Sequence, residues 1–537
     1  MATVAELLKK RDWNVIWDKY CGFAKLDWEE FRYVQDRLLE EQIELLSGCS
    51  LGKRIFGGRP PRTVEEFRRF TPMTTYEDYS DYLLEKREDV LSDKPKFWVC
   101  TSWKGTKDPV KWAPYSETMI RENAKAFMAA VIFATTNEGK INLREGDKFF
   151  YGMAPLPYLT GLAPYGIMQE IALEYLPDLE KAEKMDFMER NKEGFKLGLE
   201  KGIDIFFGLS SVLVKIAESF SQNLKGEHDS SSGSRSGVGM KTALRVGKGL
   251  AKSKIAGREL LPKDVWDIKG IICAGTDTSL FKDKIEHYWG RRPLEIYGGT
   301  ELSIVATEVA GSEGLLFFPD VNYLEFIPEE ESRKSQHRPE YVPETLLLNE
   351  LEVGKRYEIV TTKLKGGTFV RYRVGDLIRV VAPARPEMGI LMPQIRYEDR
   401  ISNVIDLAGF TRLTEVTISD AIMRTGVGVN NWVARKELGA EGPYLHLYLE
   451  PLRSMDKTAV EKAVHARLSE IDQDFRDYEQ MLGRRPMKLS LLAPGTFKEY
   501  ARAAGSSIFS RMNPDAQFVE GLLRAEETVA AAQREVG

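Results

Sequence analysis

Apolar residues in the first sixty positions recur every three or four residues, a spacing that predicts helix. The clearest stretch is FRYVQDRLLEEQIELL, whose predicted packing face consists of Phe31, Val34, Leu38 and Leu45. A second helix is predicted to follow Ser116, because serine is favoured at helix N-termini. The packing face of this second helix is predicted to consist of Ile120, Ala124, Phe127 and Val131.

The pattern changes after Trp266 to short β-rich runs separated by helix. IKGIICAG is followed by a predicted helix from Phe281 to Trp289 and then by PLEIYGGTE. Such alternation is typical of parallel α/β layering, in which the loops after the strands bind ligands. Further on, YEIVTT and FVRYRVGDLIRVV predict two adjacent strands joined at the glycine turn LKGG.

A third pattern begins after Arg396, where strand-like PYLHLYLEP and MKLSLLAP flank a charged helix predicted from about Lys457 to Phe475. We therefore expect an α/β protein with a large N-terminal domain of layered sheets and helices, residues 1–396, and a small α+β C-terminal domain, residues 397–537. Within the large domain, residues 222–258 are rich in glycine and serine and predict a surface insertion rather than a packed core.

Length and charge agree with this division. A chain of 537 residues is longer than one hydrophobic core usually supports. The net charge of -5 gives no overall field that would attract nucleic acid or an anionic membrane, so neither is an expected partner. The lysine and arginine residues of 222–258 leave two interpretations open, a solvated basic loop and a contact with an anionic partner.

The four cysteines lie far apart and form no C-x-x-C pair, which argues against a disulfide framework or a zinc site. The N-terminal MATVAELLKKRDWNVIWDKY is interrupted by charge too often for a signal peptide. No apolar run approaches the ~20 residues of a membrane span. We expect a cytoplasmic protein.

Three segments carry residues suited to nucleotide chemistry. TSWKGTKDPVK, from Thr101 to Lys111, is a Gly/Thr/Lys loop ahead of a helix, a composition that cradles phosphates. YGGTE, from Tyr297 to Glu301, ends an apolar strand. Its glycines would admit a planar ligand, the hydroxyl of Thr300 is available, and Glu301 could hold Mg²⁺ through a phosphate.

The third segment is RYRVGD, from Arg371 to Asp376, where a carboxylate after a strand and a glycine could accept both hydroxyls of a ribose. Taken singly, segments like the first two are more often surface turns. A segment like the third is more often an arginine–aspartate pair at a strand edge.

The order and spacing of these segments resemble the adenylate-forming superfamily and, within it, the acyl-acid amido synthetases of the auxin-responsive promoter family. KGTKDPVKWAP is similar to the S-G-T-T-G-x-x-K phosphate loop, YGGTE to Y-G-x-T-E, and RYRVGD, preceded by IVTT, to Y-R-V-G-D with its V-T-T strand. Arg396, Glu398 and Asp399 are similar to the R-x-D-D hinge. GTF at 495–497 and GSS at 505–507 match the C-terminal G-T-F and G-x-S, so the resemblance runs from about residue 65 to 520.

The resemblance implies a ligase that uses ATP and Mg²⁺ to activate a carboxylic acid as an acyl-adenylate and transfers it to an amine or amino acid, with coenzyme A thioester formation as a variant. The implied nucleotide-binding residues are Thr106, Tyr297, Gly298, Gly299, Asp376 and Arg396. The implied catalytic residues at the phosphates are Lys111, Thr300 and Glu301, of which Glu301 also holds Mg²⁺. Rotation of the C-terminal domain about Glu398–Asp399 is implied to exchange adenylating and transferring arrangements.

Two places depart from the family pattern. In the phosphate loop, Lys104, Lys107 and Asp108 replace Ser, Thr and Gly, and an aspartate restricts a backbone that glycine leaves free. Met512 stands where the family has a lysine that neutralises charge during adenylation. Loss of such a group typically costs on the order of 10²–10³ in rate. Arg511 and Lys498 are the candidate substitutes.

These departures keep two alternatives open. One is an adenylate-fold enzyme that has lost ATP use and condenses or transfers a pre-activated acyl group, and the other is a non-catalytic ligand-binding homologue. YGMAPLPYLTGLAPY, residues 151–165, lies where the family builds part of its acyl pocket, and its composition suits an apolar or aromatic acid. Tyr158 and Thr160 are the candidate contacts, and a buried core strand and turn is the other interpretation of this segment.

Overall fold

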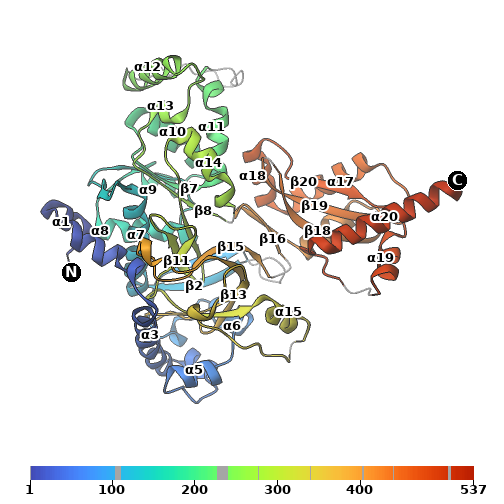
Figure 1. Cartoon of the computed structure of the whole chain (residues 1–537), viewed down its shortest axis with the longest axis horizontal. Helices are drawn as coiled ribbons and strands as arrows, with labels where there is room; N and C mark the ends of the chain where they lie inside the picture. Colours follow the sequence, from blue (N-terminus) through green and yellow to red (C-terminus); the bar gives the residue numbers. More distant parts are fainter. Residues whose placement is uncertain are drawn as a thin grey trace. The chain divides into compact units, whose positions relative to one another are not determined.

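A computed structural model describes residues 2–102, 110–225, 240–275, 277–338, 340–401, 404–439, 441–505 and 509–536. The described residues divide into two compact units, which we call the large unit (residues up to 102 and 110–398) and the small unit (residues from 399) (Figure 1). Each unit has its own sheet and its own hydrophobic core.

Helices begin the large unit, as their apolar spacing predicts: α1 (Val4–Lys10), α2 (Trp13–Ile16), α3 (Trp28–Gly48), α4 (Ser50–Ile55), α5 (Val64–Phe70) and α6 (Glu77–Leu83). The predicted packing face of α3 is wrong at Leu45, which is 44% exposed, because the buried face includes the next residue, Leu46. Two glutamines share this face. Gln35 bonds the backbone of β12 (Asn322–Pro328), an edge strand whose outer groups need partners. Gln42 donates to the Gly367 carbonyl in the LKGG turn.

An eleven-stranded mixed sheet forms the centre of the large unit, in the order β12-β13-β14-β15-β11-β10-β9-β8-β7-β5-β6. Five neighbouring strands run parallel: β5 (Lys148–Tyr151), β6 (Glu174–Leu176), β7 (Ile205–Leu209), β8 (Gly270–Ala274) and β9 (Leu294–Gly299). The other half contains antiparallel pairs among β12 and the following strands: β10 (Ser303–Glu308), β11 (Leu315–Phe317), β13 (Arg356–Lys363), β14 (Tyr372–Ala382) and β15 (Gln394–Arg400). The predicted α/β class is confirmed.

Helices cover both faces of the parallel half. On one face, α7 (Glu117–Thr135) begins as predicted at Ser116, whose hydroxyl accepts from the amide of Met119 at 3.4 Å. Phe127 of α7 meets Phe207 at 4.9 Å, whereas Phe206 packs into the cluster on the opposite face. That face is covered by α10 (Phe187–Lys201), α11 (Ser210–Lys225) and α14 (Thr278–Trp289). Because successive strand residues point to opposite faces, β7 is apolar throughout.

Helix is also present in part of the 222–258 stretch, to which the sequence pattern assigned no element. Residues 226–239 lie outside the described residues. α12 (Met240–Ile255) follows and packs beside α10 and α13 (Pro262–Val265). Shorter elements complete the large unit: β1 (Pro95–Ser102), β2 (Val110–Ser116), β3 (Thr136–Asn137), β4 (Lys140–Ile141), α8 (Ala163–Glu170), α9 (Leu179–Ala182) and α15 (Glu329–His337).

The small unit is the predicted α+β structure. Its strands are β16 (Val404–Leu407), β17 (Thr411–Thr414), β18 (Val429–Gly439), β19 (Gly442–Pro451) and β20 (Met487–Leu491). Its helices are α16 (Glu415–Arg424), α17 (Lys457–Ile471), α18 (Gln473–Leu482), α19 (Thr496–Ala504) and α20 (Ala516–Val536). The single helix predicted to end near Phe475 is two helices, because Asp472 ends the first and its carboxylate caps the second by accepting from the Phe475 amide at 2.8 Å.

All four cysteines are buried and form no disulfide. Among the helices that the structure describes, none has the length and apolar content needed to cross a membrane.

Candidate functional site

The YGGTE segment forms the hairpin between β9 and β10, and its two glycines play different parts. A Cβ on Gly298 would lie 2.2 Å from the carbonyl oxygen of Ser303 across the hairpin. A Cβ on Gly299 would meet only a side-chain methyl of Leu302, at 3.8 Å. Glycine at 298 is therefore required by the close approach of the protein's own backbone, before any ligand is considered.

Ser303 follows the turn and is the centre of a buried hydrogen-bond network. Its backbone has φ of 64°, its side chain is fully buried, and its hydroxyl lies 2.9 Å from the Tyr115 hydroxyl and 2.8 Å from the Asn123 amide. Lys363 donates to the same hydroxyl and to the Leu302 carbonyl, and burial lowers the pKa of its ammonium group well below the usual value. Tyr115 also donates to the Thr300 carbonyl at 2.8 Å. The network thus holds the turn that presents Thr300 and Glu301.

Glu301 brings the three predicted segments together. Lys111 of β2 donates to the Glu301 carboxylate at 3.2 Å, and Tyr372 of β14 donates to the same oxygen at 3.0 Å. Lys111 also donates to the Tyr372 hydroxyl at 3.0 Å and lies over the ring of Tyr76, 5.1 Å from its centre. Thr300 and Glu301 are both 8% exposed, so this carboxylate and its cation form a nearly buried pair at the end of β9.

A second contact joins β9 to β14. The Tyr297 hydroxyl donates to the Asp376 carboxylate at 2.7 Å, and Asp376 is 5% exposed. Gly375, immediately before it, has φ of 76°, a conformation that favours glycine. The Tyr297 ring packs against Tyr397, with ring centres 5.6 Å apart. The predicted adenine and ribose residues therefore lie in direct contact.

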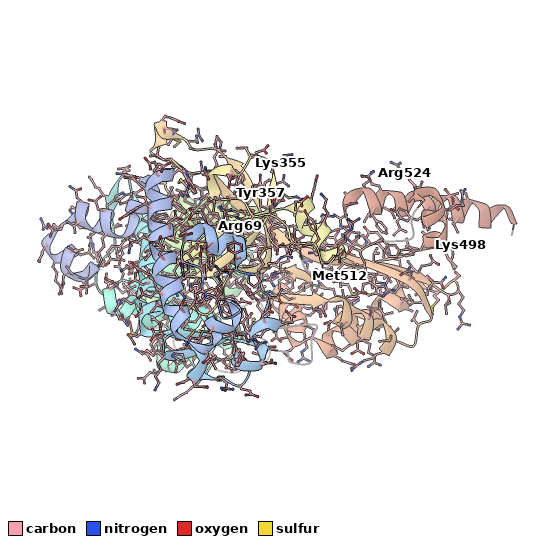
Figure 2. All side chains as sticks on the ribbon, turned by 90° about the horizontal axis from the view of Figure 1, so that it is seen from below. Arg69, Lys355, Tyr357, Lys498, Met512 and Arg524 are labelled. Carbon is pink, nitrogen blue, oxygen red and sulfur yellow. The ribbon has the colours of Figure 1, made fainter. Side chains whose placement is uncertain are left out.

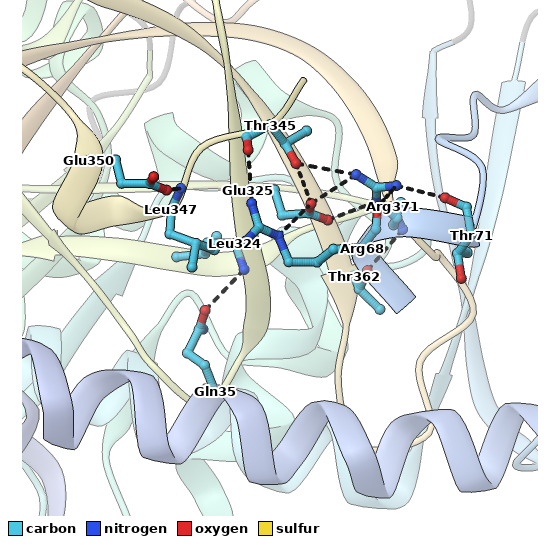
Figure 3. Close-up of polar contacts among 10 residues, drawn as sticks. All are labelled: Gln35, Arg68, Thr71, Leu324, Glu325, Thr345, Leu347, Glu350, Thr362 and Arg371. Carbon is cyan, nitrogen blue, oxygen red and sulfur yellow. Dashed lines mark hydrogen bonds and ion pairs between the residues drawn. The ribbon is translucent and has the colours of Figure 1, made fainter. Parts of the chain in front are cut away.

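Arg371 does not pair with Asp376, contrary to the alternative interpretation of the third segment. Its guanidinium makes two bonds of 2.9 Å to the Glu325 carboxylate and donates to the carbonyls of Arg68 and Thr71 at 2.7 Å (Figure 3). The backbone amide of Arg371 donates to the Thr362 hydroxyl at 2.9 Å. The buried guanidinium thus anchors the start of the strand that carries Tyr372 and Asp376.

Other candidate residues lie elsewhere. Thr106, with Lys104, Lys107 and Asp108 of the phosphate loop, lies outside the described residues. Arg396 is exposed on β15, immediately before Tyr397. Glu398 of the predicted hinge is held by two bonds from Arg379, at 2.7 and 2.8 Å.

The 151–165 segment borders a small pocket of about 20 Å³. Tyr151, Met153 and Tyr165 are among its lining residues, as is Arg190, which is 3% exposed and donates to the Met153 carbonyl. Burial lowers the pKa of Arg190. Tyr158 is 49% exposed, and the Thr160 hydroxyl is bonded to the Ala154 carbonyl at 2.8 Å.

In the small unit, Met512 is 3% exposed and its neighbours Arg511 and Asn513 bond the backbone of Ala434 in β18. Arg511 lies 3.3 Å from the Glu415 carboxylate. Lys498 is exposed on α19 and is well separated from Met512 within the small unit (Figure 2). Of the two candidate substitutes, Arg511 is thus the nearer to position 512.

Sequence reasoning missed Ser303, Lys363, Tyr115 and Tyr372 as parts of the site. Tyr372 stood inside a quoted motif, so its position was available. Ser303 and Lys363 are 60 residues apart and carry no motif, and only the pairing of the strands brings them together.

Two family models match the chain. The N-terminal domain of the GH3 family matches residues 24–152, which include Lys111, and the central domain of the same family matches residues 315–392, which include Asp376. The chain is thus similar to the GH3 family over these two regions. The family resemblance inferred from the motifs is confirmed.

One GH3 relative is the jasmonoyl–L-amino acid synthetase GH3.5 of Oryza sativa subsp. japonica, which is 27% identical over 237 residues. This match covers 40% of the present chain and 39% of the relative, so it spans about two fifths of the relative's length.

Solved structures share the fold over most of their length. The AtGH3.15 acyl acid amido synthetase in complex with 2,4-DB has a TM-score of 0.51 and 16% identity, covering 92% of this chain and 93% of that one. A 2-hydroxyisobutyryl-CoA ligase in complex with 2-HIB-AMP and CoA has a TM-score of 0.56 and 16% identity, covering 87% of each chain. The predicted adenylate-forming fold, with its small C-terminal α+β part, is confirmed.

Proposed function

We propose that this protein is a member of the GH3 family and an ATP-dependent ligase that activates a carboxylic acid and joins it to an amine, in particular an amino acid, through an amide bond. The observation that carries the proposal is the meeting of Lys111, Glu301, Tyr372, Tyr297 and Asp376 in the large unit. These residues come from all three segments that resemble the nucleotide motifs of the family. The named activities of the rice relative and of AtGH3.15 support an amide product.

The chemistry proceeds in two steps. The carboxylate oxygen of the acid attacks the α-phosphorus of ATP, and pyrophosphate leaves with the electrons of the broken P–O bond. The amine nitrogen then attacks the acyl carbon, AMP leaves, and the nitrogen loses a proton. Activation is required because a free carboxylate is anionic and lacks a good leaving group.

Asp376 and Tyr297 suit the nucleoside. A buried carboxylate can accept from both hydroxyls of a ribose, and the Tyr297 hydroxyl already holds that carboxylate in place. The Tyr297 ring is the proposed contact of the adenine, with Gly298 and Gly299 beside it, while Thr106 and Arg396 are the further proposed nucleotide contacts. Thr300 and Lys111 would face the phosphates, where a cation offsets the charge that develops during adenylation.

Glu301 is the carboxylate that would hold Mg²⁺. The described residues contain no group of three or more His, Cys, Asp or Glu side chains that could hold a metal by themselves. A Mg²⁺ ion beside Glu301 would therefore take most of its ligands from phosphate oxygens and water, as this ion commonly does. When bound, it would neutralise phosphate charge. Lys111 balances the Glu301 carboxylate in the present structure.

The acid is proposed to enter beside the 151–165 segment. The tyrosine and methionine side chains lining the pocket suit an apolar or aromatic acid, and the guanidinium of Arg190 adds one cation. Tyr158 and Thr160 remain proposed contacts at the edge of this segment. The four buried, unpaired cysteines agree with a reducing compartment, and we propose the cytoplasm.

Met512 favours a second candidate function. A buried methionine cannot supply the charge of the lysine that the family pattern has at this position. An enzyme that transfers an already activated acyl group would not need that charge, and neither would a non-catalytic homologue. In the proposed ligase, the guanidinium of Arg511 would supply the positive charge that Met512 lacks.

ATP–pyrophosphate exchange over a panel of apolar and aromatic acids tests the proposal. The ligase requires acid-dependent exchange and an amide product when an amino acid is added. Absence of exchange with ATP binding retained would favour the non-catalytic homologue. Absence of both would favour transfer of a pre-activated acyl group.

Asp376→Ala tests the nucleoside site by calorimetry. Loss of hydrogen bonds to a charged group should weaken ATP binding roughly 10- to 100-fold. Asp320→Ala is the matched control, since this carboxylate lies in the same unit and pairs with Lys365 at 3.3 Å. Equal ATP affinity in the parent and in Asp376→Ala would refute the ribose role.

A further inference from the structure

α12 differs in charge from the rest of the molecule. Between residues 240 and 258 the chain has six cationic side chains and no acidic one, although the whole chain has a net charge of -5. The cations are Lys241, Arg245, Lys248, Lys252, Lys254 and Arg258. The helix lies at the outer end of the large unit, beyond α10 and α13 as seen from the sheet (Figure 1).

One side of α12 is used for packing. Arg245 donates to the carbonyls of Gly198 and Leu199 at the end of α10. A Cβ on Gly249 would lie 3.0 Å from a methyl of Val265 in α13, and Ser253 is 3% exposed. These three residues are four apart in sequence, so they form one line along the helix.

The opposite side presents apolar residues to solvent. Leu244 is 68% exposed and Ile255 is 88% exposed. With Ala251 between them, they have the spacing of residues that share one face of a helix. Single exposed apolar residues are ordinary. A stripe of them opposite a packed face is typical of a helix that contacts another apolar surface, such as a membrane interface.

Lysines border this stripe on both sides. Helical geometry places Lys241, Lys248 and Lys252 along one border and Lys254 along the other. Within the part of the chain that the structure describes, none of these four lysines forms an ion pair. Arg258, by contrast, is bonded to Asp264 at 2.7 and 2.8 Å.

We propose that α12 is a docking helix for an anionic lipid surface. The stripe of Leu244, Ala251 and Ile255 would enter the headgroup region, and the bordering lysines would contact anionic headgroups. A nucleic acid would use the lysines but leave Leu244 and Ile255 in water. The stripe is also narrow and includes the small side chain of Ala251, which suits shallow insertion rather than the filling of a protein groove.

This inference modifies the expectation drawn from the whole-chain charge. Screening limits electrostatic attraction to about 10 Å, so a local group of cations acts at a surface whatever the net charge of the molecule. The proposal is independent of the ligase activity, because the helix contributes no residue to the proposed nucleotide site.

Vesicle co-sedimentation of the full chain tests it. We expect binding to phosphatidylcholine vesicles that contain phosphatidylserine, weak binding to phosphatidylcholine alone, and release by salt. Each lysine near such a surface contributes roughly fivefold in affinity, so K248E/K252E should weaken binding at least about 25-fold. L244S/I255S should weaken it at least about tenfold, because it removes the inserted side chains.

The matched control is K457E/K462E, which changes the charge equally at two exposed lysines of α17. It should bind within about twofold of the parent if position rather than net charge matters. All variants should keep the thermal midpoint and pyrophosphate exchange of the parent, since none touches the core or the proposed site. Equal binding by parent and helix variants, or equal loss in the control, would overturn the proposal. So would weakening by K248E/K252E but not by L244S/I255S, the result expected for an anionic polymer or an acidic protein.

Discussion

Replacing Glu325 by glutamine should destabilise the large unit more than any exposed ion pair can. Glu325 is 1% and Arg371 7% exposed at the side chain, and the carboxylate also accepts from the Thr345 hydroxyl at 2.6 Å. The neutral amide keeps the volume but leaves the Arg371 guanidinium buried without a counter-charge. Breaking a buried pair in this way typically costs about 3–5 kcal/mol.

Hydrogen exchange at the amides of β13 and β14 measures this cost locally. A loss of that size should speed exchange by a factor of roughly 10² to 10⁴ if these strands open with the large unit. Asp89→Asn is the control, because Asp89 also makes two bonds to an arginine, Arg87, but is 64% exposed at the side chain. Its exchange should match that of the parent.

The same variant should also weaken ATP binding, since Arg371 directly precedes Tyr372 and lies five residues before Asp376. Exchange in Glu325→Gln that is as slow as in Asp89→Asn would refute the reasoning. That result would mean that water reaches the guanidinium, or that the backbone moves to expose it, at little cost in free energy.

Three further changes have defined outcomes. Gly298→Ala should weaken ATP binding severalfold and lower the thermal midpoint, because its Cβ would clash with the Ser303 carbonyl at 2.2 Å. Gly299→Ala should do neither, since its Cβ has room. Similar behaviour of the two variants would contradict this reasoning. Although burial raises the pKa of Glu122, hydrogen bonds from two lysines hold it at about 2, below the usual 4.5. The ionised Glu122 carboxylate therefore stabilises the folded protein above pH 4.5, and this stabilisation is lost as the pH falls toward 2. The parent should melt at a higher temperature than Glu122→Gln, by a difference that shrinks across that pH window. A constant difference in thermal midpoint would count against this reasoning. Met512→Lys should raise pyrophosphate exchange if the missing cation limits the rate, and an unchanged rate would show that another residue already supplies it.

Local pattern was sufficient where one element determines its own structure. Ser116 and the apolar spacing after it predicted α7, because the cap and the packing face lie within a few residues of each other. The same reasoning failed at Leu45, since apolar character alone cannot reveal that two glutamines occupy the buried face. Gln35 bonds the edge strand β12 there, and Gln42 bonds the turn at Gly367. α12 was missed because glycine and serine dominate the composition of its surroundings, although lysine, leucine and alanine favour helix within it.

The candidate site was predictable in its segments but not in its contacts. Tyr297, Glu301 and Asp376 stood out because glycine-rich strand ends followed by acids are recognisable in sequence. That Lys111 bonds Glu301, or that Tyr297 bonds Asp376, depends on pairings between residues far apart in the chain. The role assigned to Gly298 shows the same limit. The sequence suggested that this glycine makes room for a ligand, whereas the atom nearest to an added Cβ is the protein's own Ser303 carbonyl oxygen.

The bond between Tyr297 and Asp376 has a consequence for the shape of the sheet. β9 and β14 are four places apart in the strand order, with β10, β11 and β15 between them. Strands in a flat sheet lie about 4.8 Å apart, so these two would be separated by roughly 19 Å, too far for a tyrosine and an aspartate to meet. The hydrogen bond therefore requires that this part of the sheet curl toward closure, with both residues on its concave wall. Curvature, rather than strand sequence, is what brings the proposed adenine and ribose contacts together, and a change that flattened this wall would separate them without altering either residue.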